Sequence, residues 1–197
     1  MKNQAIIGIL LILLSSCARY EAGTLENLQP ELAPYAETKS GVTLYVKKFT
    51  RDDCKRILDR DLIRAGYQPL QLTIKNDTKK FIVFSNQDTE PPTVPVQEVA
   101  EKVHTATPVR VIGYVAAGII FWPMFIPAVV DGVLSSEANR KLDKDFDTKS
   151  LEQAVIQPYA TINGIIFLSL SESQEPFEVI LVDGETNDKI SYRVTGI

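Results

Sequence analysis

The sequence predicts a mainly β fold with an α-helical insertion near its middle. Strand-like patterns of apolar and polar residues occur at 42–47 and 70–84, and they return at 162–195. Residues 101–150 instead hold a long uncharged run and helical spacing. Strand-rich stretches that flank a helical segment indicate one β domain that is built from both halves of the chain.

The first half of the predicted domain contains a strand and then one short helix. Val42, Leu44 and Val46 alternate with polar neighbours, which is the pattern of a half-buried strand. Thr50 and Asp53 have the spacing of a capping box at the start of a helix. The apolar residues that follow share one helical face and are Cys54, Ile57, Leu58, Leu62 and Ala65, with Gly66 as the stop.

A β-hairpin is expected after this helix. Residues 70–75 alternate in the manner of a strand, residues 76–78 have the composition of a turn, and residues 81–84 return as a more apolar strand. Prolines between residues 91 and 95 then break the pattern.

The end of the chain is also β. Strands are expected over Ile162–Leu170, Phe177–Val182 and Lys189–Thr195, the last two joined by a turn at 183–188. Residues 41–100 and 151–197 are therefore expected to form an immunoglobulin-like β-sandwich with one short helix near its start.

The insertion, residues 101–150, contains a long apolar run. Val111–Val130 are twenty residues without a charge, and a helix of this length would cover about 30 Å, the thickness of a hydrocarbon core. Pro123 and Pro127 oppose one continuous helix, because an interior proline removes a backbone hydrogen bond. We therefore expect an apolar helical hairpin, with one helix ending near Phe121 and a second beginning near Pro127.

The second helix of this hairpin is expected to be amphipathic. Its apolar residues recur at four-residue spacing and are Val130, Leu134, Ala138, Leu142 and Phe146. Two interpretations of the hairpin stay open. In one, it packs on the sandwich; in the other, its tip, with Trp122, Met124 and Phe125, contacts lipid or a partner protein. A true membrane span ranks behind both.

Few residues are suited to catalysis or metal binding. His104 is the sole histidine, so a zinc site made of histidines is excluded, and we expect its side chain to be solvated. Cys54 lies on the apolar face of the predicted helix and is expected to be a core residue. Asp143, Asp145 and Asp147 have the acid spacing that opens a calcium loop, but the glycine and the final glutamate of such a loop are missing.

The N-terminus has the parts of an export signal. Lys2 supplies a positive charge, and Ala5–Leu14 is an apolar run of ten residues, too short for a membrane span. Leu14-Ser15-Ser16-Cys17 follows, and this tetrapeptide resembles the lipobox of bacterial lipoproteins. The resemblance implies that residues 1–16 are a signal peptide that is removed, and that the thiol of Cys17 carries fatty acids such as palmitate.

Lipid attachment determines where the protein is expected. Two or three acyl chains bind a bilayer almost permanently, since each buried methylene contributes about 0.8 kcal/mol. Ala18 differs from the aspartate that commonly retains lipoproteins in the inner membrane, so the resemblance implies the outer membrane, with the body facing the periplasm. Residues 17–40, with Pro30 and Pro34, are expected to be a lipidated tether without regular structure.

These patterns predict a lipid-anchored envelope protein that binds or scaffolds an unidentified envelope protein partner. The alternative is a membrane-active protein whose apolar hairpin enters a bilayer. The residues predict no enzyme, no metal, no cofactor and no evident small-molecule substrate. The formal net charge of −4, without a dense basic patch, is unfavourable for binding nucleic acid.

Overall fold

The structure is a computed structural model that describes residues 19–30, 33–104, 125–173 and 176–197, with the backbone alone for residues 125–135. Contacts divide the chain into two units. The larger unit contains residues 22–103 and 145–197, and the smaller unit contains residues 1–21 and 104–144. Every described strand lies in the larger unit.

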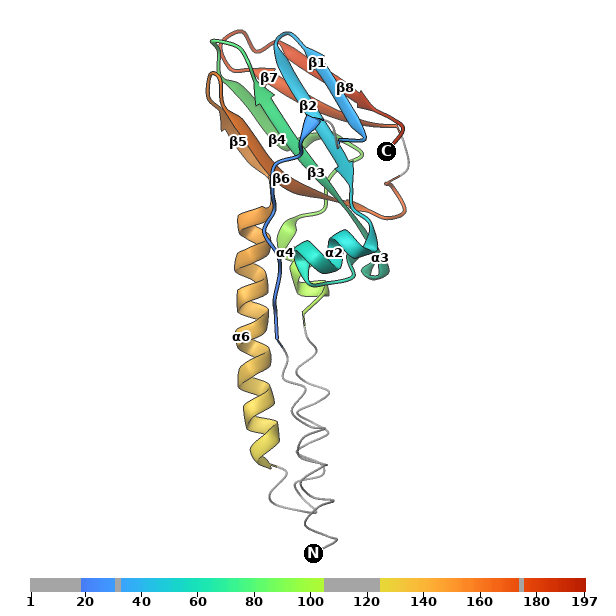
Figure 1. The fold of residues 1–197 in the computed structure, drawn as a ribbon, viewed down its shortest axis with the longest axis vertical. Helices are drawn as coiled ribbons and strands as arrows, with labels where there is room; N and C mark the ends of the chain where they lie inside the picture. Colours follow the sequence, from blue (N-terminus) through green and yellow to red (C-terminus); the bar gives the residue numbers. More distant parts are fainter. Residues whose placement is uncertain (1–18, 31–32, 105–124, 174–175) are drawn as a thin grey trace, which may run out of the picture. The chain divides into compact units, whose positions relative to one another are not determined.

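The larger unit is built from two antiparallel sheets that face each other (Figure 1). The first sheet, in the order β1-β2-β3-β6, contains β1 (Tyr35–Lys39), β2 (Val42–Lys48), β3 (Tyr67–Asn76) and β6 (Thr161–Ser169). The second, in the order β5-β4-β7-β8, contains β5 (Gln153–Ile156), β4 (Ile82–Glu90), β7 (Phe177–Asp183) and β8 (Lys189–Val194). The prediction of a mainly β fold is confirmed, and two facing sheets are consistent with a β-sandwich.

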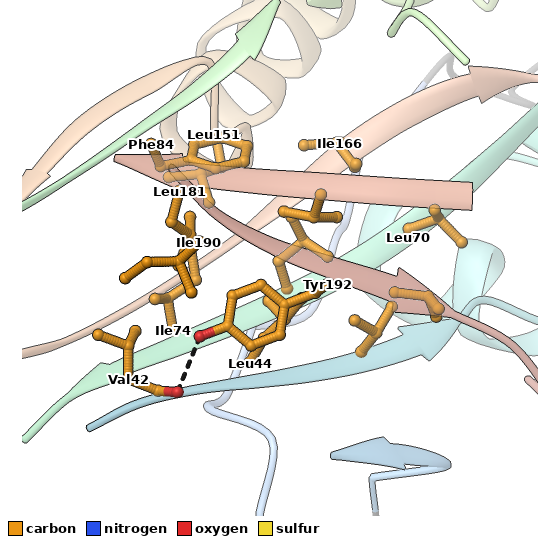
Figure 2. Packing of buried hydrophobic residues seen from close by; sticks show 14 of the residues in the cluster. Val42, Leu44, Leu70, Ile74, Phe84, Leu151, Ile166, Leu181, Ile190 and Tyr192 are labelled. Carbon is orange, nitrogen blue, oxygen red and sulfur yellow. Dashed lines mark hydrogen bonds between the residues drawn. The ribbon is translucent and has the colours of Figure 1, made fainter. Parts of the chain in front are cut away.

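Apolar side chains from both sheets fill the space between them (Figure 2). Val42, Leu44 and Val46 of β2 are fully buried, as their alternation predicts. Tyr192 of β8 is also fully buried, and its hydroxyl donates a hydrogen bond of 2.8 Å to the backbone oxygen of Val42. The phenol thus keeps a polar partner inside an apolar core, and it joins the two sheets.

Most predicted strands are confirmed, but one predicted connection is wrong. β2, β6, β7 and β8 cover the expected residues, and β7 pairs with β8. The expected hairpin between residues 70–75 and 81–84 does not form, because β3 pairs with β2 and β6, whereas β4 pairs with β5 and β7. The chain therefore crosses from one sheet to the other at the turn after β3.

Asn76, the last residue of β3, explains this crossing. Its side chain is fully buried, and its amide nitrogen lies 2.8 Å from the backbone oxygen of Lys80, 3.3 Å from that of Ile156 and 3.1 Å from that of Gln157. Its amide oxygen accepts hydrogen bonds from the backbone N–H and the hydroxyl of Thr78. Asn76 thus orders the turn after β3 and joins it to the connection between β5 and β6.

The described helices are α2 (Arg51–Leu58), α3 (Leu62–Ala65), α4 (Val96–Lys102) and α6 (Phe125–Lys149). α2 begins with the predicted capping box, in which the backbone N–H groups of Thr50 and Asp53 each donate to the other's side chain at 3.1 Å. The single helix expected up to Gly66 is instead two helices. The break occurs because Asp59 adopts a left-handed φ of 51° and ends α2.

The long helix α6 belongs to the predicted insertion. It is described over Phe125–Lys149, and the predicted burial is confirmed at Ala138, Leu142 and Phe146. The first hairpin helix, expected up to Phe121, lies outside the described residues. None of the helices that the structure describes is long and apolar enough to cross a membrane.

Three elements form where the sequence analysis expects none: β1, β5 and α4. β1 corrects the expectation of a tether without regular structure over residues 17–40, since it pairs along its whole length with β2. β5 and α4 are too short for hydrophobic periodicity to predict them.

Asn76→Ala should lower the free energy of unfolding by about 2–4 kcal/mol, since a buried backbone group that loses its partner costs about 1–3 kcal/mol. Urea unfolding followed by circular dichroism measures this change. Asn27→Ala is a matched control at an exposed asparagine and should stay within about 0.5 kcal/mol of the native protein. An unchanged unfolding midpoint for Asn76→Ala would contradict the role given to this side chain.

Candidate functional site

A network of polar contacts fixes residues 22–29, here called the docked segment, along β3. The backbone N–H of Leu28 donates to the hydroxyl of Thr73 at 3.1 Å. The side-chain amide of Gln71 donates to the backbone oxygen of Glu26 at 2.6 Å. Part of the expected tether is therefore held on the surface of the larger unit.

Asn163 of β6 completes this network. Its amide nitrogen donates to the backbone oxygen of Glu26 at 3.1 Å, and its amide oxygen accepts from Gln71 at 2.9 Å and from Thr73 at 2.8 Å. Gln71 and Thr73 alternate with core residues of β3, yet they are only 3% and 2% exposed. Their burial is tolerated because the docked segment and Asn163 satisfy their hydrogen bonds.

The docked segment begins with a close backbone contact at Gly23. Its N–H donates to the backbone oxygen of Arg56, near the end of α2, at 2.9 Å. A Cβ atom at this position would lie 2.7 Å from the same oxygen, closer than side chains come in real proteins. The contact therefore requires glycine.

The backbone oxygen of Gly23 also accepts a hydrogen bond from Lys149, whose ammonium group is buried. Its Nζ lies 2.7 Å from the backbone oxygens of Gly23 and Ile57, and 2.7 Å from Oδ2 of Asp145. An ammonium group has three donors, so these acceptors use all of them. Lys149 thereby joins the docked segment, α2 and the last turn of α6.

A second ionic cluster centres on Asp53 of α2. Its carboxylate accepts hydrogen bonds from Lys47 at 3.0 Å, from Arg56 at 2.9 Å and from the backbone N–H of Thr50 at 3.1 Å. Burial raises the pKa of this carboxyl, but the hydrogen bonds from Lys47, Thr50 and Arg56 outweigh burial and hold the pKa at about 2. The ionised carboxylate fixes the start of α2 against β2.

Two clefts open on the larger unit. One, of about 310 Å³, lies beside the docked segment and is lined in part by Glu26, Lys47 and Arg56. The other, of about 680 Å³, is lined by Asn86, Gln87, Pro92, Thr93, Pro95, Gln97, Glu152 and Gln153. The amide side chains of this larger cleft make no hydrogen bond to any residue that the structure describes, so both their donors and their acceptors face a ligand or solvent.

The candidate site residues from the sequence analysis are only partly described. Cys17, Trp122 and Met124 lie outside the described residues, and Phe125 is described by its backbone alone, as the first residue of α6. Cys54 is fully buried, as predicted. Burial raises the pKa of its thiol to about 11, so this cysteine is a poor nucleophile at neutral pH.

His104 and the aspartates of α6 differ from expectation. His104 is not fully solvated: Nε2 lies 2.6 Å from Oδ1 of Asp143, within the smaller unit. Asp143 and Asp145 lie in a helix and not in a loop, and Asp145 binds Lys149. Among the described residues, no group of three or more side chains is placed to hold a metal ion.

Comparison with known proteins assigns no family, since no family model, no curated protein and no solved structure matches the chain.

Lys149→Met should lower the free energy of unfolding by about 3 kcal/mol, because hydrogen bonds to a charged group contribute about 1.5–3 kcal/mol and the buried carbonyl group of Ile57 loses a donor. Urea unfolding of the full chain in detergent measures it. Lys141→Met is the control and should leave stability nearly unchanged, since Lys141 is exposed and water screens its ion pair with Glu137. Equal losses in the two variants would show that Lys149 has no special role.

Asp53→Asn should lower the free energy of unfolding at neutral pH by about 2 kcal/mol, which is the equivalent of moving a pKa from 3.8 to about 2. Because the folded-state pKa is depressed, this contribution is present above about pH 4 and is lost as the pH falls toward 2. Urea unfolding at several pH values should show the difference from the native protein shrinking in acid.

The control for this pH dependence is Asp52→Asn, at the exposed neighbouring carboxylate, which should stay within about 0.5 kcal/mol of the native protein at every pH. A difference between Asp53→Asn and the native protein that does not change with pH would contradict the assignment.

Proposed function

We propose that this chain is a lipid-anchored envelope protein that faces the periplasm, anchored in the outer membrane, and that its β domain binds or scaffolds an envelope protein without catalysing a reaction. The observation that carries the proposal is the tetrapeptide Leu14-Ser15-Ser16-Cys17, directly after an apolar run of export-signal length. Acyl chains on Cys17 would hold the chain on the bilayer. Support comes from Gly23, which lies six residues after that cysteine and is bound to Arg56 of the β domain.

The binding function of the proposal needs a surface, and the larger cleft supplies one. Asn86, Gln87, Gln97 and Gln153 offer amide groups along it, and two prolines line it. Uncharged donors and acceptors of this kind suit the backbone of an extended polypeptide, which presents both. We further propose that the sandwich is immunoglobulin-like and that its insertion is a helical hairpin, supported by the two facing sheets and by α6.

Cys17→Ser should abolish fatty-acid labelling and leave the signal peptide uncut, which raises the mass of the protein found in the cell. Metabolic labelling with a palmitate analogue and intact-mass measurement detect both effects. Cys54→Ala is the matched control: it removes the other cysteine, which is buried, and should leave labelling unchanged. Labelling that persists in Cys17→Ser would overturn the proposal.

A membrane-active protein is the second candidate, favoured by the uncharged run Val111–Val130. If the hairpin tip contacts lipid, a Cys17→Ser protein made without residues 1–16, which lacks both the acyl chains and the apolar signal peptide, should still float with liposomes. Replacing Trp122, Met124 and Phe125 by Ser in that protein should abolish flotation. The substitutions should change the free energy of unfolding by no more than about 0.5 kcal/mol each if the tip is exposed. Failure of the Cys17→Ser protein without residues 1–16 to float would reject this candidate.

A further inference from the structure

The chain leaves the larger unit at three points, before residue 22, after residue 103 and before residue 145, and all three are bound to the same short stretch of chain. Gly23 donates to the backbone oxygen of Arg56, and Lys149 donates to that of Ile57. Arg60 donates through Nε to the backbone oxygen of Val103 at 3.1 Å. The stretch Arg56–Arg60, with these three partners, is here called the α2 end.

The α2 end lies at one extremity of the sandwich, beside α3 and α4 (Figure 1). The docked segment runs in the same direction as β3, since Glu26 bonds Gln71 and Leu28 bonds Thr73. Gly23 therefore lies toward Tyr67, the first residue of β3. The turn after Asn76 lies at the other end of this ten-residue strand, about 30 Å away.

The length of chain between Cys17 and Gly23 limits how far the sandwich can move from a lipid anchor. Six residue steps separate the two positions. A fully extended chain spans at most about 3.3–3.6 Å per residue, so Gly23 can lie no more than about 20 Å from Cys17. Because Gly23 is bound to Arg56 and Lys149, the distance between Cys17 and the α2 end is limited in the same way.

We propose that the α2 end is the membrane-facing surface of the sandwich, that its partner is the lipid bilayer surface, and that the turn at residues 77–80 points away from it. The inference rests on the proposed acylation of Cys17. The exposed charged side chains of α2 are Arg51, Asp52, Lys55 and Arg56, and Arg56 is paired with Asp53. Chain length limits the distance of the α2 end from the bilayer at every salt concentration, whereas any attraction between these charges and anionic lipid is screened by salt.

The test is energy transfer from the protein to acceptor-labelled lipid headgroups. Full-length acylated protein carrying Cys54→Ala is labelled with a donor dye at Lys55→Cys or, in a matched variant, at Lys79→Cys; both positions are exposed. Each protein is placed in phosphatidylethanolamine and phosphatidylglycerol vesicles. Transfer from position 55 should exceed transfer from position 79 about twofold or more, because the two sites differ in height by about the length of β3.

A longer linker between Cys17 and the docked segment provides the control. Inserting about twelve Gly and Ser residues between Ala18 and Arg19 adds flexible reach without touching the docked segment, so transfer from position 55 should fall to that from position 79. Intact mass is measured on every sample. If acylated protein with the native linker shows equal transfer from both positions, the orientation alone is overturned. If Cys17 carries no acyl chains, both the proposed function and this inference are overturned.

Discussion

The buried ammonium of Lys149 is the contact on which the rest of the arrangement depends. A charge removed from water needs a full set of partners, and here these come from the docked segment, from α2 and from α6. Phe146, one turn earlier in α6, stacks on Phe167 of β6 with ring centroids 5.9 Å apart. The end of α6 is thus held to the sandwich by one polar and one aromatic contact.

The docked segment buries polar side chains on the outer face of the sheet that it covers. A sheet at the surface of a sandwich normally exposes one polar face to water. Here Gln71 and Thr73 exchange water for the backbone of the docked segment, so these two outward-facing side chains are as buried as core residues. Order in this segment is therefore a consequence of side chains that lie far away in the sequence.

Sequence patterns that act within a few residues predicted the local structure well. Contacts between residues far apart in the sequence could not be predicted. β2 and the start of α2 were predictable because alternation at Val42–Val46 and the spacing of Thr50 and Asp53 act within a few residues. The docked segment was missed because Gln71 and Thr73 look like solvent-facing residues until their partners are known. The false hairpin at Asn76 has the same cause, since a turn composition does not tell which sheet the chain enters next.

Val103 and Lys149 are both bound close to the end of α2, which affects how well the residues between them tolerate insertions and deletions. The residues between them leave and re-enter the sandwich at neighbouring points. They therefore form a long insertion whose two ends are already held close together by the β domain. The entropy of closing such a loop grows only slowly with its length. Insertions or deletions within residues 104–137, which precede the buried residues at the end of α6, would thus leave the folding of the sandwich largely untouched.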